Sequence, residues 1–308
     1  MMTTKLTIII PAYNEAAVLT VSVQRLLAIE DGIAANNPLN QRADLLIVDD
    51  CSTDKTWSII TKMHEQNARV RGLRFSRNFG HQQALMAGLA EAVKTADLMV
   101  TIDADLQDDP DKIPEMVEQA MDGMDIVDGV RNNRETDGWF KRTSAQSYYK
   151  VLRALGIELV PNHADFRLMS RRAVETLLAY PERNLFIRRL IPRLGYPTGA
   201  VYYKRTPRLA GESKYPLKKM LAFAWDGITS LTVAPIRLLL IVGAFVCLLA
   251  VVMGLAGLVH HGWSPLMTSL WLLGGGQMIG IGIVGEYIGK IMIEVKGRPR
   301  YTIQTVLE

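Results

Sequence analysis

Short apolar runs rich in β-branched residues recur along the chain, and segments with helical periodicity separate them. The runs have the length and composition of buried strands and span residues 6–10, 44–48, 70–75, 98–102, 125–130, 164–168 and 201–204. Strands alternating with helices are typical of a mostly parallel sheet with helices on both faces. We therefore predict an α/β, Rossmann-like fold, with Pro11 ending the first strand and residues 31–42 forming a loop.

The fourth run leads directly into Asp103 and Asp105, with Gln107 two residues further on. If the strand continued through them, side chains two residues apart would point to the same side. Ligands of open α/β sheets bind outside the carboxyl ends of the strands. Oxygen ligands of this kind suit Mg²⁺ or Mn²⁺ shared with substrate phosphates. The plainer alternative is an acidic turn that caps the next helix.

The C-terminal part of the chain contains two uncharged stretches, residues 238–259 and 266–285. Each is long enough to cross roughly 30 Å of hydrocarbon, and basic residues flank the pair on its outer sides, which places both ends in the cytosol. Residues 216–232 carry an apolar face beside lysines, as in a helix lying in the membrane interface, or alternatively in a surface helix packed on the core.

These features divide the chain into four predicted parts. They are a catalytic domain at 1–215, an interfacial helix at 216–232, a transmembrane pair at 233–290 (about 236–259 and 266–288) and a cytosolic tail at 291–308.

The charge balance points to phosphates or anionic lipid as partners. The formal net charge is +4 and the isoelectric point about 9.0, but no nucleic-acid-binding motif is visible, so we expect no nucleic-acid partner. The two cysteines, Cys51 and Cys247, are far apart in the sequence. A disulfide is therefore not expected, which agrees with a cytosol-facing domain.

Several motifs follow one another along the chain, at residues 11–15, 48–54, 77–80, 103–108 and 211–215. Together they resemble the inverting GT-A glycosyltransferases of family 2. Within that family, Asp165-Phe166-Arg167-Leu168 and the C-terminal pair are similar to the polyprenyl-phosphate glycosyltransferases, which include the GtrB-type bactoprenol glucosyltransferases and the dolichol-phosphate mannose synthases. The chain departs from the family pattern at Cys51, where a smaller residue is usual, and in a longer insert at 32–41.

The resemblance implies a role for each motif residue. Those that would frame the nucleotide base and ribose are Pro11, Tyr13, Glu15 and Asp50. Arg77 and Gly80 would lie at the donor sugar or diphosphate, and Asp103 would face the donor. Asp105 and Gln107 would hold Mg²⁺ or Mn²⁺ on the diphosphate, so Asp103 and Asp105 are predicted to be catalytic.

The acceptor implied by the resemblance is a lipid phosphate. Arginine forks match phosphate oxygens well, so Arg131 and Arg142 are the first candidates to bind it, with Arg134 and Lys214 as further candidates. Asp165 is a predicted catalytic residue with two alternative roles. It could act as a general base, or it could orient Arg167, the acceptor or a donor hydroxyl.

We therefore predict transfer of a sugar, from UDP-glucose, to undecaprenyl phosphate with inversion. The enzyme would be a homo-oligomer of the bacterial plasma membrane. Three alternatives remain open: a GDP-mannose-dependent synthase, a transferase specific for UDP-N-acetylglucosamine, and a non-catalytic membrane scaffold. A processive polysaccharide synthase is disfavoured, because the chain lacks the Q-x-x-R-W motif and further spans.

Overall fold

The computed structural model describes residues 4–36, 43–131, 163–182, 187–204 and 265–308, with a few further positions between 241 and 252. The chain forms two compact units. The first comprises Met1–Gln146, Leu159–Lys214 and Pro299–Glu308, and the second comprises Ser147–Glu158 and Tyr215–Arg298. The first unit contains the sheet and all the described site residues, and each unit is considered separately below.

The first unit is built on a mixed sheet in the order β7-β5-β6-β4-β1-β2-β3-β8. Strands β1, β2, β3 and β4 are parallel to one another, and β5 is parallel to β7. Strand β6 runs antiparallel to both β4 and β5, and β8 runs antiparallel to β3. The strands are β1 (Leu6–Ala12), β2 (Asp44–Asp49), β3 (Val70–Phe75), β4 (Leu98–Thr101), β5 (Ile126–Arg131), β6 (His163–Ser170), β7 (Thr198–Tyr203) and β8 (Ile303–Leu307).

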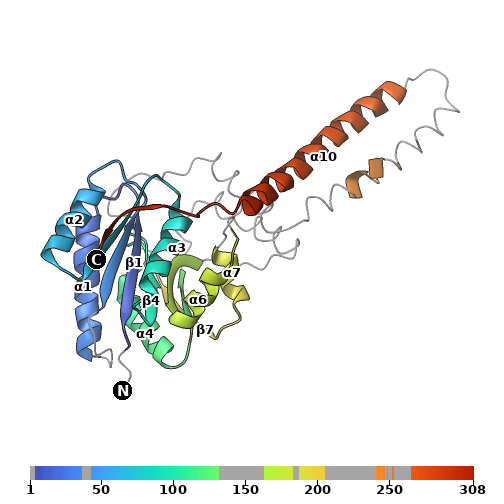
Figure 1. The fold of residues 1–308 in the computed structure, drawn as a ribbon. Helices are drawn as coiled ribbons and strands as arrows, with labels where there is room; N and C mark the ends of the chain where they lie inside the picture. The colour runs from blue at the N-terminus through green and yellow to red at the C-terminus, as the bar shows by residue number, and fades with distance from the viewer. Residues whose placement is uncertain are drawn as a thin grey trace. The chain divides into compact units, whose positions relative to one another are not determined.

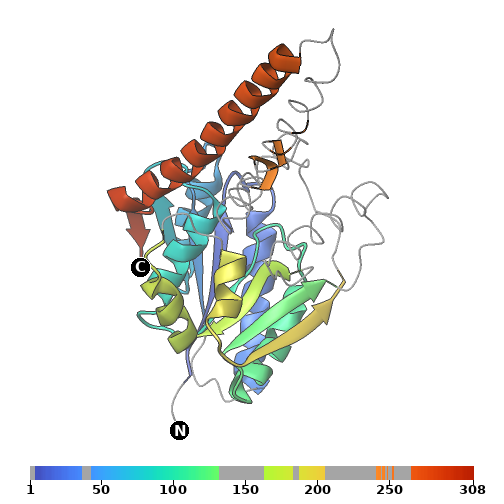
Figure 2. The ribbon, with the colours of Figure 1, turned by 90° about the vertical axis from the view of Figure 1, so that its right-hand side faces the viewer.

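Helices cover both faces of this sheet (Figures 1 and 2). Alternate side chains of β1 enter two separate cores: Ile8 and Ile10 pack in one and Ile9 in the other, which explains why the strand is apolar at every position. The first core contains residues of α1 (Leu19–Asn36), α2 (Thr56–Gln66) and α4 (Ile113–Met121), which follows the 3-10 turn Pro110–Lys112. The second contains residues of α3 (His81–Ala92), α6 (Arg171–Ala179) and α7 (Ile187–Arg193).

The predicted end of the first strand at Pro11 is wrong. β1 continues to Ala12, and Pro11 pairs with Val48 of β2 in the register of the sheet. Ile9 accepts a hydrogen bond from Ile102, just beyond β4, whereas Ala12 accepts one from Asp50 on the β2 side. By this alternation, Pro11 faces the β4 side beyond the last β4 pair. Its missing N–H therefore removes no bond of the ladder.

Other boundaries also differ from the predictions. Residues 31–36, predicted as loop, continue α1, while residues 37–42 lie outside the described part of the chain. Neither α7 nor β8 was predicted, and β8 adds a C-terminal strand to the sheet edge at β3. The predicted interfacial helix at 216–232 lies outside the described residues.

The second unit contains the long helix α10, Pro265–Lys296. It contains the second predicted membrane segment and continues to Lys296, into the predicted tail, while most of the first segment lies outside the described residues. Large apolar side chains of α10 are exposed, with Met278 at 77% and Ile281 at 72%. Within the part of the chain that the structure describes, no helix combines the length and apolar character that crossing a membrane requires.

Candidate active site

The loops that follow β1 and β2 are joined by hydrogen bonds at the carboxyl edge of the sheet. The backbone N–H of Asn14 donates to the Ser52 hydroxyl, and that of Glu15 donates to the Thr56 hydroxyl, each over 2.9 Å. The Asn14 side chain in turn accepts from the Thr53 N–H over 2.9 Å. Asn14 has a φ of 56°, a conformation that asparagine tolerates better than most residues. These bonds fix the predicted nucleotide-binding loops relative to each other.

Asp50 fastens a third loop, Ser76–Gly80, to the same edge. Its carboxylate accepts the backbone N–H of Phe79 over 2.7 Å and that of Gly80 over 2.9 Å. Burial raises the pKa of Asp50, although these two hydrogen bonds act in the opposite direction. The predicted contact of Asp50 with the nucleotide remains a prediction. The role visible in the structure is to position the loop.

The other predicted donor-binding residues surround this loop edge. Tyr13 keeps 40% of its surface exposed and directly follows β1, which contains Pro11. The Arg77 guanidinium lies 3.9 Å from the centre of the Phe79 ring, and it donates to the Asn78 carbonyl over 3.1 Å. Gly80 has a φ of 95°, which only glycine adopts readily. The donor contacts themselves remain predictions.

The Asp-x-Asp segment is a turn and not a continuation of β4. The strand ends at Thr101, and the backbone N–H of Leu106 donates to the Asp103 carbonyl over 3.2 Å. The N–H of Gln107 donates to the Asp105 carboxylate over 3.3 Å. The strand alternation from which we predicted a shared direction for Asp103, Asp105 and Gln107 therefore does not apply here. The positions of the Asp103 and Asp105 carboxylates are therefore set by this turn.

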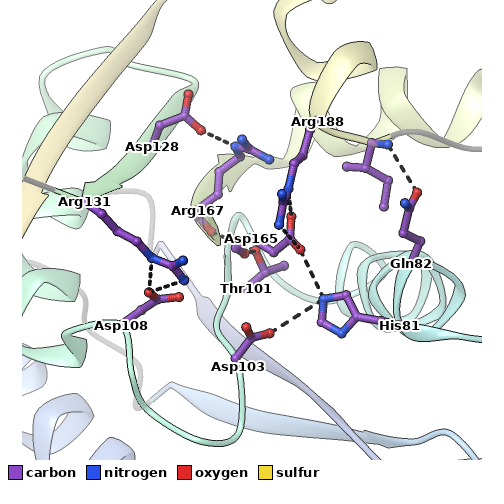
Figure 3. A network of polar contacts seen from close by, with 11 residues as sticks. His81, Gln82, Thr101, Asp103, Asp108, Asp128, Arg131, Asp165, Arg167 and Arg188 are labelled. Carbon is purple, nitrogen blue, oxygen red and sulfur yellow. Dashed lines mark hydrogen bonds and ion pairs between the residues drawn. The ribbon is translucent and has the colours of Figure 1, made fainter. Parts of the chain in front are cut away.

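A chain of charged side chains lies beside this turn, and Figure 3 shows its members. Nε2 of His81 lies 3.2 Å from the Asp165 carboxylate and 3.6 Å from that of Asp103. The Arg188 guanidinium binds both oxygens of Asp165, each over 3.0 Å. Since β6 runs antiparallel to β4, its first residues, including Asp165, lie at the carboxyl end of β4. The Thr101 hydroxyl also donates to the Asp165 carbonyl over 2.6 Å.

This arrangement shifts the pKa values of Asp165 and Asp103 in opposite directions. Burial alone would raise the pKa of Asp165, but the His81 and Arg188 hydrogen bonds and charges outweigh it and hold that pKa far below its usual range. Burial, with the Asp165, Asp108 and Asp105 charges, raises the pKa of Asp103 to about 6 despite the opposing His81 charge. A carboxylate held by two cations in this way accepts a proton poorly, and both predicted roles of Asp165 remain predictions.

A second ion pair holds the turn from the other side. Nε of Arg131 donates to the Asp108 carboxylate over 2.9 Å, and the Tyr203 hydroxyl donates to the same oxygen over 2.7 Å. Arg131 and Tyr203 are register partners at the ends of β5 and β7. Arg131, predicted to bind the lipid phosphate, is thus already paired with a carboxylate. The other predicted phosphate-binding residues, Arg134, Arg142 and Lys214, lie outside the described residues.

Sequence reasoning assigned no role to His81, Arg188, Asp108 or Tyr203. His81 could have been found, since it directly follows the Arg77–Gly80 motif and starts α3. Asp108 could also have been found, since it is the last residue of the acidic motif at 103–108. No local pattern marks Arg188 or Tyr203. Arg188 is positioned by α7, whose first residue donates its N–H to Gln82 on α3 over 3.4 Å.

The residues present fit a divalent cation that is shared with a substrate. Among the described residues, no group of three or more His, Cys, Asp or Glu side chains could hold a metal ion by itself. Mg²⁺ usually binds through one or two carboxylates together with substrate phosphates, so such a site needs no cage made of protein alone. Burial raises the pKa of Asp103 most, and repulsion from the Asp165, Asp108 and Asp105 carboxylates adds to it. A cation on Asp105 and Gln107 would relieve that repulsion.

Comparison with known proteins identifies the family. Residues 7–178 match the family described as glycosyl transferase family 2. The chain belongs to this family. It is therefore a glycosyltransferase with the GT-A α/β fold, as predicted. Residues 234–291 match a second description, the GtrB C-terminal hairpin, so the resemblance given above is confirmed.

The relatives are similar to nearly the whole chain. An uncharacterised glycosyltransferase of Bacillus subtilis, YkoT, is 45% identical over 97% of this chain and 90% of its own length. The bactoprenol glucosyl transferase of Shigella phage SfX is 36% identical over 98% of this chain and 99% of its own. A prophage bactoprenol glucosyl transferase homologue of Escherichia coli is 36% identical over the same shares.

Proposed function

We propose that this glycosyltransferase transfers glucose from UDP-glucose to undecaprenyl phosphate, with inversion, on the cytosolic leaflet of the bacterial plasma membrane. The named activity of two relatives, bactoprenol glucosyl transfer, supports the lipid acceptor. The match to the GtrB hairpin supports attachment to the membrane. The basic residues on the outer sides of the two uncharged stretches support a cytosolic catalytic domain and cytosolic termini, and the enzyme would act as a homo-oligomer. The exposed apolar side chains of α10 suit a lipid environment.

The observation that carries the proposal is the state of Asp165. Its carboxylate is held by Arg188 and His81, and its pKa is far below the usual range. A sugar hydroxyl acceptor would need a general base to remove its proton. A phosphate acceptor needs none, because its second pKa is about 6 and the oxygen is largely ionised at neutral pH. A site whose central carboxylate is a poor base therefore suits a phosphate nucleophile.

The residues on the donor side have separate roles in this proposal. Asp105 and Gln107 would hold Mg²⁺ or Mn²⁺, which neutralises charge on the departing nucleoside diphosphate. Arg77 and Gly80 would contact the diphosphate, while Pro11, Tyr13 and Glu15 frame the base and ribose. Asp50 would keep the Ser76–Gly80 loop in place through its two backbone hydrogen bonds.

The residues on the acceptor side must attract a phosphate. Arg131 lies at the end of β5, next to the acidic turn. Its pairing with Asp108 fixes the guanidinium at this place, where its positive charge would attract the incoming phosphate. Asp165 orients Arg188 and His81 around the same region, and Asp103 faces the donor.

A donor screen tests the proposal. Detergent-purified protein with Mg²⁺ or Mn²⁺ and undecaprenyl phosphate is incubated in turn with UDP-glucose, UDP-N-acetylglucosamine, UDP-galactose and GDP-mannose. Nucleoside diphosphate release that depends on the lipid, with UDP-glucose as the preferred donor, is expected. Asp105→Asn should abolish this turnover, and near-normal rates in that variant would contradict the metal assignment. Preference for another donor would correct the sugar.

A further inference from the structure

The C-terminal segment Pro299–Leu307, here called the strap, extends the sheet to the Ser76–Gly80 loop. Its strand β8 pairs with β3, with a register shift between Arg74 and Phe75. Beyond that shift the Ser76 N–H donates to the Thr302 carbonyl over 3.1 Å. The backbone of the strap thus holds the first residue of the loop that Asp50 fastens at its other end.

A row of aromatic rings makes a second connection between the strap and the loop. The Tyr301 ring stacks on Phe75, with centres 5.3 Å apart and planes 14° from parallel. Phe75 meets Phe79 edge to face, at 5.5 Å and 84°. Arg77 then covers the Phe79 ring at 3.9 Å. The row therefore runs from Tyr301 through the fully buried Phe75 and the Phe79 ring to the guanidinium of Arg77 in the Ser76–Gly80 loop.

The two supports of Phe79 are complementary. Its backbone is fixed by the hydrogen bond to Asp50, and its ring is fixed by Phe75. Arg77 packs on the face of that ring, so the ring orientation decides where the guanidinium lies. Phe75 is held on its other side by Tyr301, beside a cavity of about 400 Å³ lined by Tyr301, Met86 and Leu178. Tyr301 is therefore the ring that supports Phe75 from the strap, in addition to the core that buries it.

We propose that Tyr301 is a positioning residue for nucleotide-sugar binding, acting through Phe75 and Phe79 to hold Arg77. The inference rests on the proposed role of the Ser76–Gly80 loop at the donor diphosphate. It makes the segment after the hairpin part of the donor site. The action depends on the ring and not on the tyrosine hydroxyl, because Tyr301 joins the row by stacking its ring on Phe75.

The test compares three substitutions in the full-length protein. Tyr301→Leu keeps apolar volume without a ring, Tyr301→Phe keeps the ring, and Gln304→Ala alters an exposed residue of β8 as the control. An aromatic pair is worth enough to change an equilibrium about three- to tenfold. Tyr301→Leu should therefore raise the donor KM about three- to tenfold, with kcat and the acceptor KM nearly unchanged. Tyr301→Phe and Gln304→Ala should behave like the unaltered protein.

Hydrogen exchange supplies a readout that needs no activity. The amides of Phe79 and Gly80 are protected by Asp50, and peptides covering them should exchange several-fold faster in Tyr301→Leu alone. Unchanged exchange in these peptides of Tyr301→Leu would overturn the inference. A Tyr301→Leu variant in which kcat, the donor KM and the acceptor KM all worsen by the same factor would also overturn it. If the unaltered protein uses no donor, the proposed function fails, and the exchange result still decides the role of Tyr301.

Discussion

Because of the buried carboxylate of Glu30, we predict that the folded protein loses stability as the pH rises towards 8. The residue lies on α1 with 1% of its surface exposed, and among the described residues neither carboxylate oxygen has a hydrogen-bond partner. Among the described residues, Glu30 forms an ion pair with Arg69, whose Nη1 lies 3.8 Å from the carboxylate. Burial raises the pKa of Glu30 from 4.5 to about 8, with Asp44 and Asp31 acting in the same direction and Arg69 against them.

The sign of the effect follows from proton linkage. Between pH 4.5 and 8 the folded protein keeps a proton on Glu30 that the unfolded chain has lost. Stability therefore falls as pH rises through this range. At about 1.4 kcal/mol for each unit, the loss between pH 5 and pH 8 is on the order of 3 kcal/mol. For a domain of this size that corresponds to roughly 10 °C in Tm.

Glu30→Gln should remove this penalty without changing the shape of the side chain. Melting curves of the variant and the unaltered protein should nearly coincide at pH 5 and separate by roughly 10 °C at pH 8, with the variant the more stable. Glu65→Gln, an identical change at an exposed position of α2, should show no such difference. Parallel Tm profiles for Glu30→Gln and the unaltered protein from pH 5 to pH 8 would refute the reasoning.

Two further predictions concern the site and the core. Arg188→Met and Asp165→Asn should each lower kcat in the transfer assay. The double variant should be no slower than the worse single variant, because each substitution removes the same ion pair. Additive losses of kcat in the double variant would contradict this. Gly88→Ala should destabilise the fold by about 1–3 kcal/mol, since an added Cβ would lie 2.3 Å from the Ile9 side chain. The matched change Gly32→Ala, in helix α1 with open space around it, should be neutral or stabilising in thermal melts.

The fold could be predicted from the sequence where local patterns are strong. The strand at 70–75 is where it was predicted, because its apolar run has clear ends. Pro11 misled the prediction, because its position beyond the last β4 pair depends on the sheet order. β8 was missed for the same reason: a strand with several exposed residues becomes recognisable only once its partner β3 is known.

The site was predictable in its acidic residues but not in their partners. Asp103, Asp105 and Asp165 carry the motif, and the structure brings Asp103 and Asp165 together around His81. The low basicity of Asp165 comes mainly from His81 and Arg188 on two different helices. No spacing along the chain reports that packing, so the sequence left the choice between base and orienting residue open.

The configuration of the lipid-linked product tests the central claim most directly. UDP-glucose labelled with ¹³C at C1 is incubated with the purified protein and undecaprenyl phosphate, and the extracted lipid is examined by mass spectrometry and NMR. Direct attack by the lipid phosphate predicts one hexose per lipid with the β configuration at C1. An α-linked product would contradict a single inverting displacement. Glucose transferred to an acceptor other than the lipid phosphate would contradict the proposed reaction.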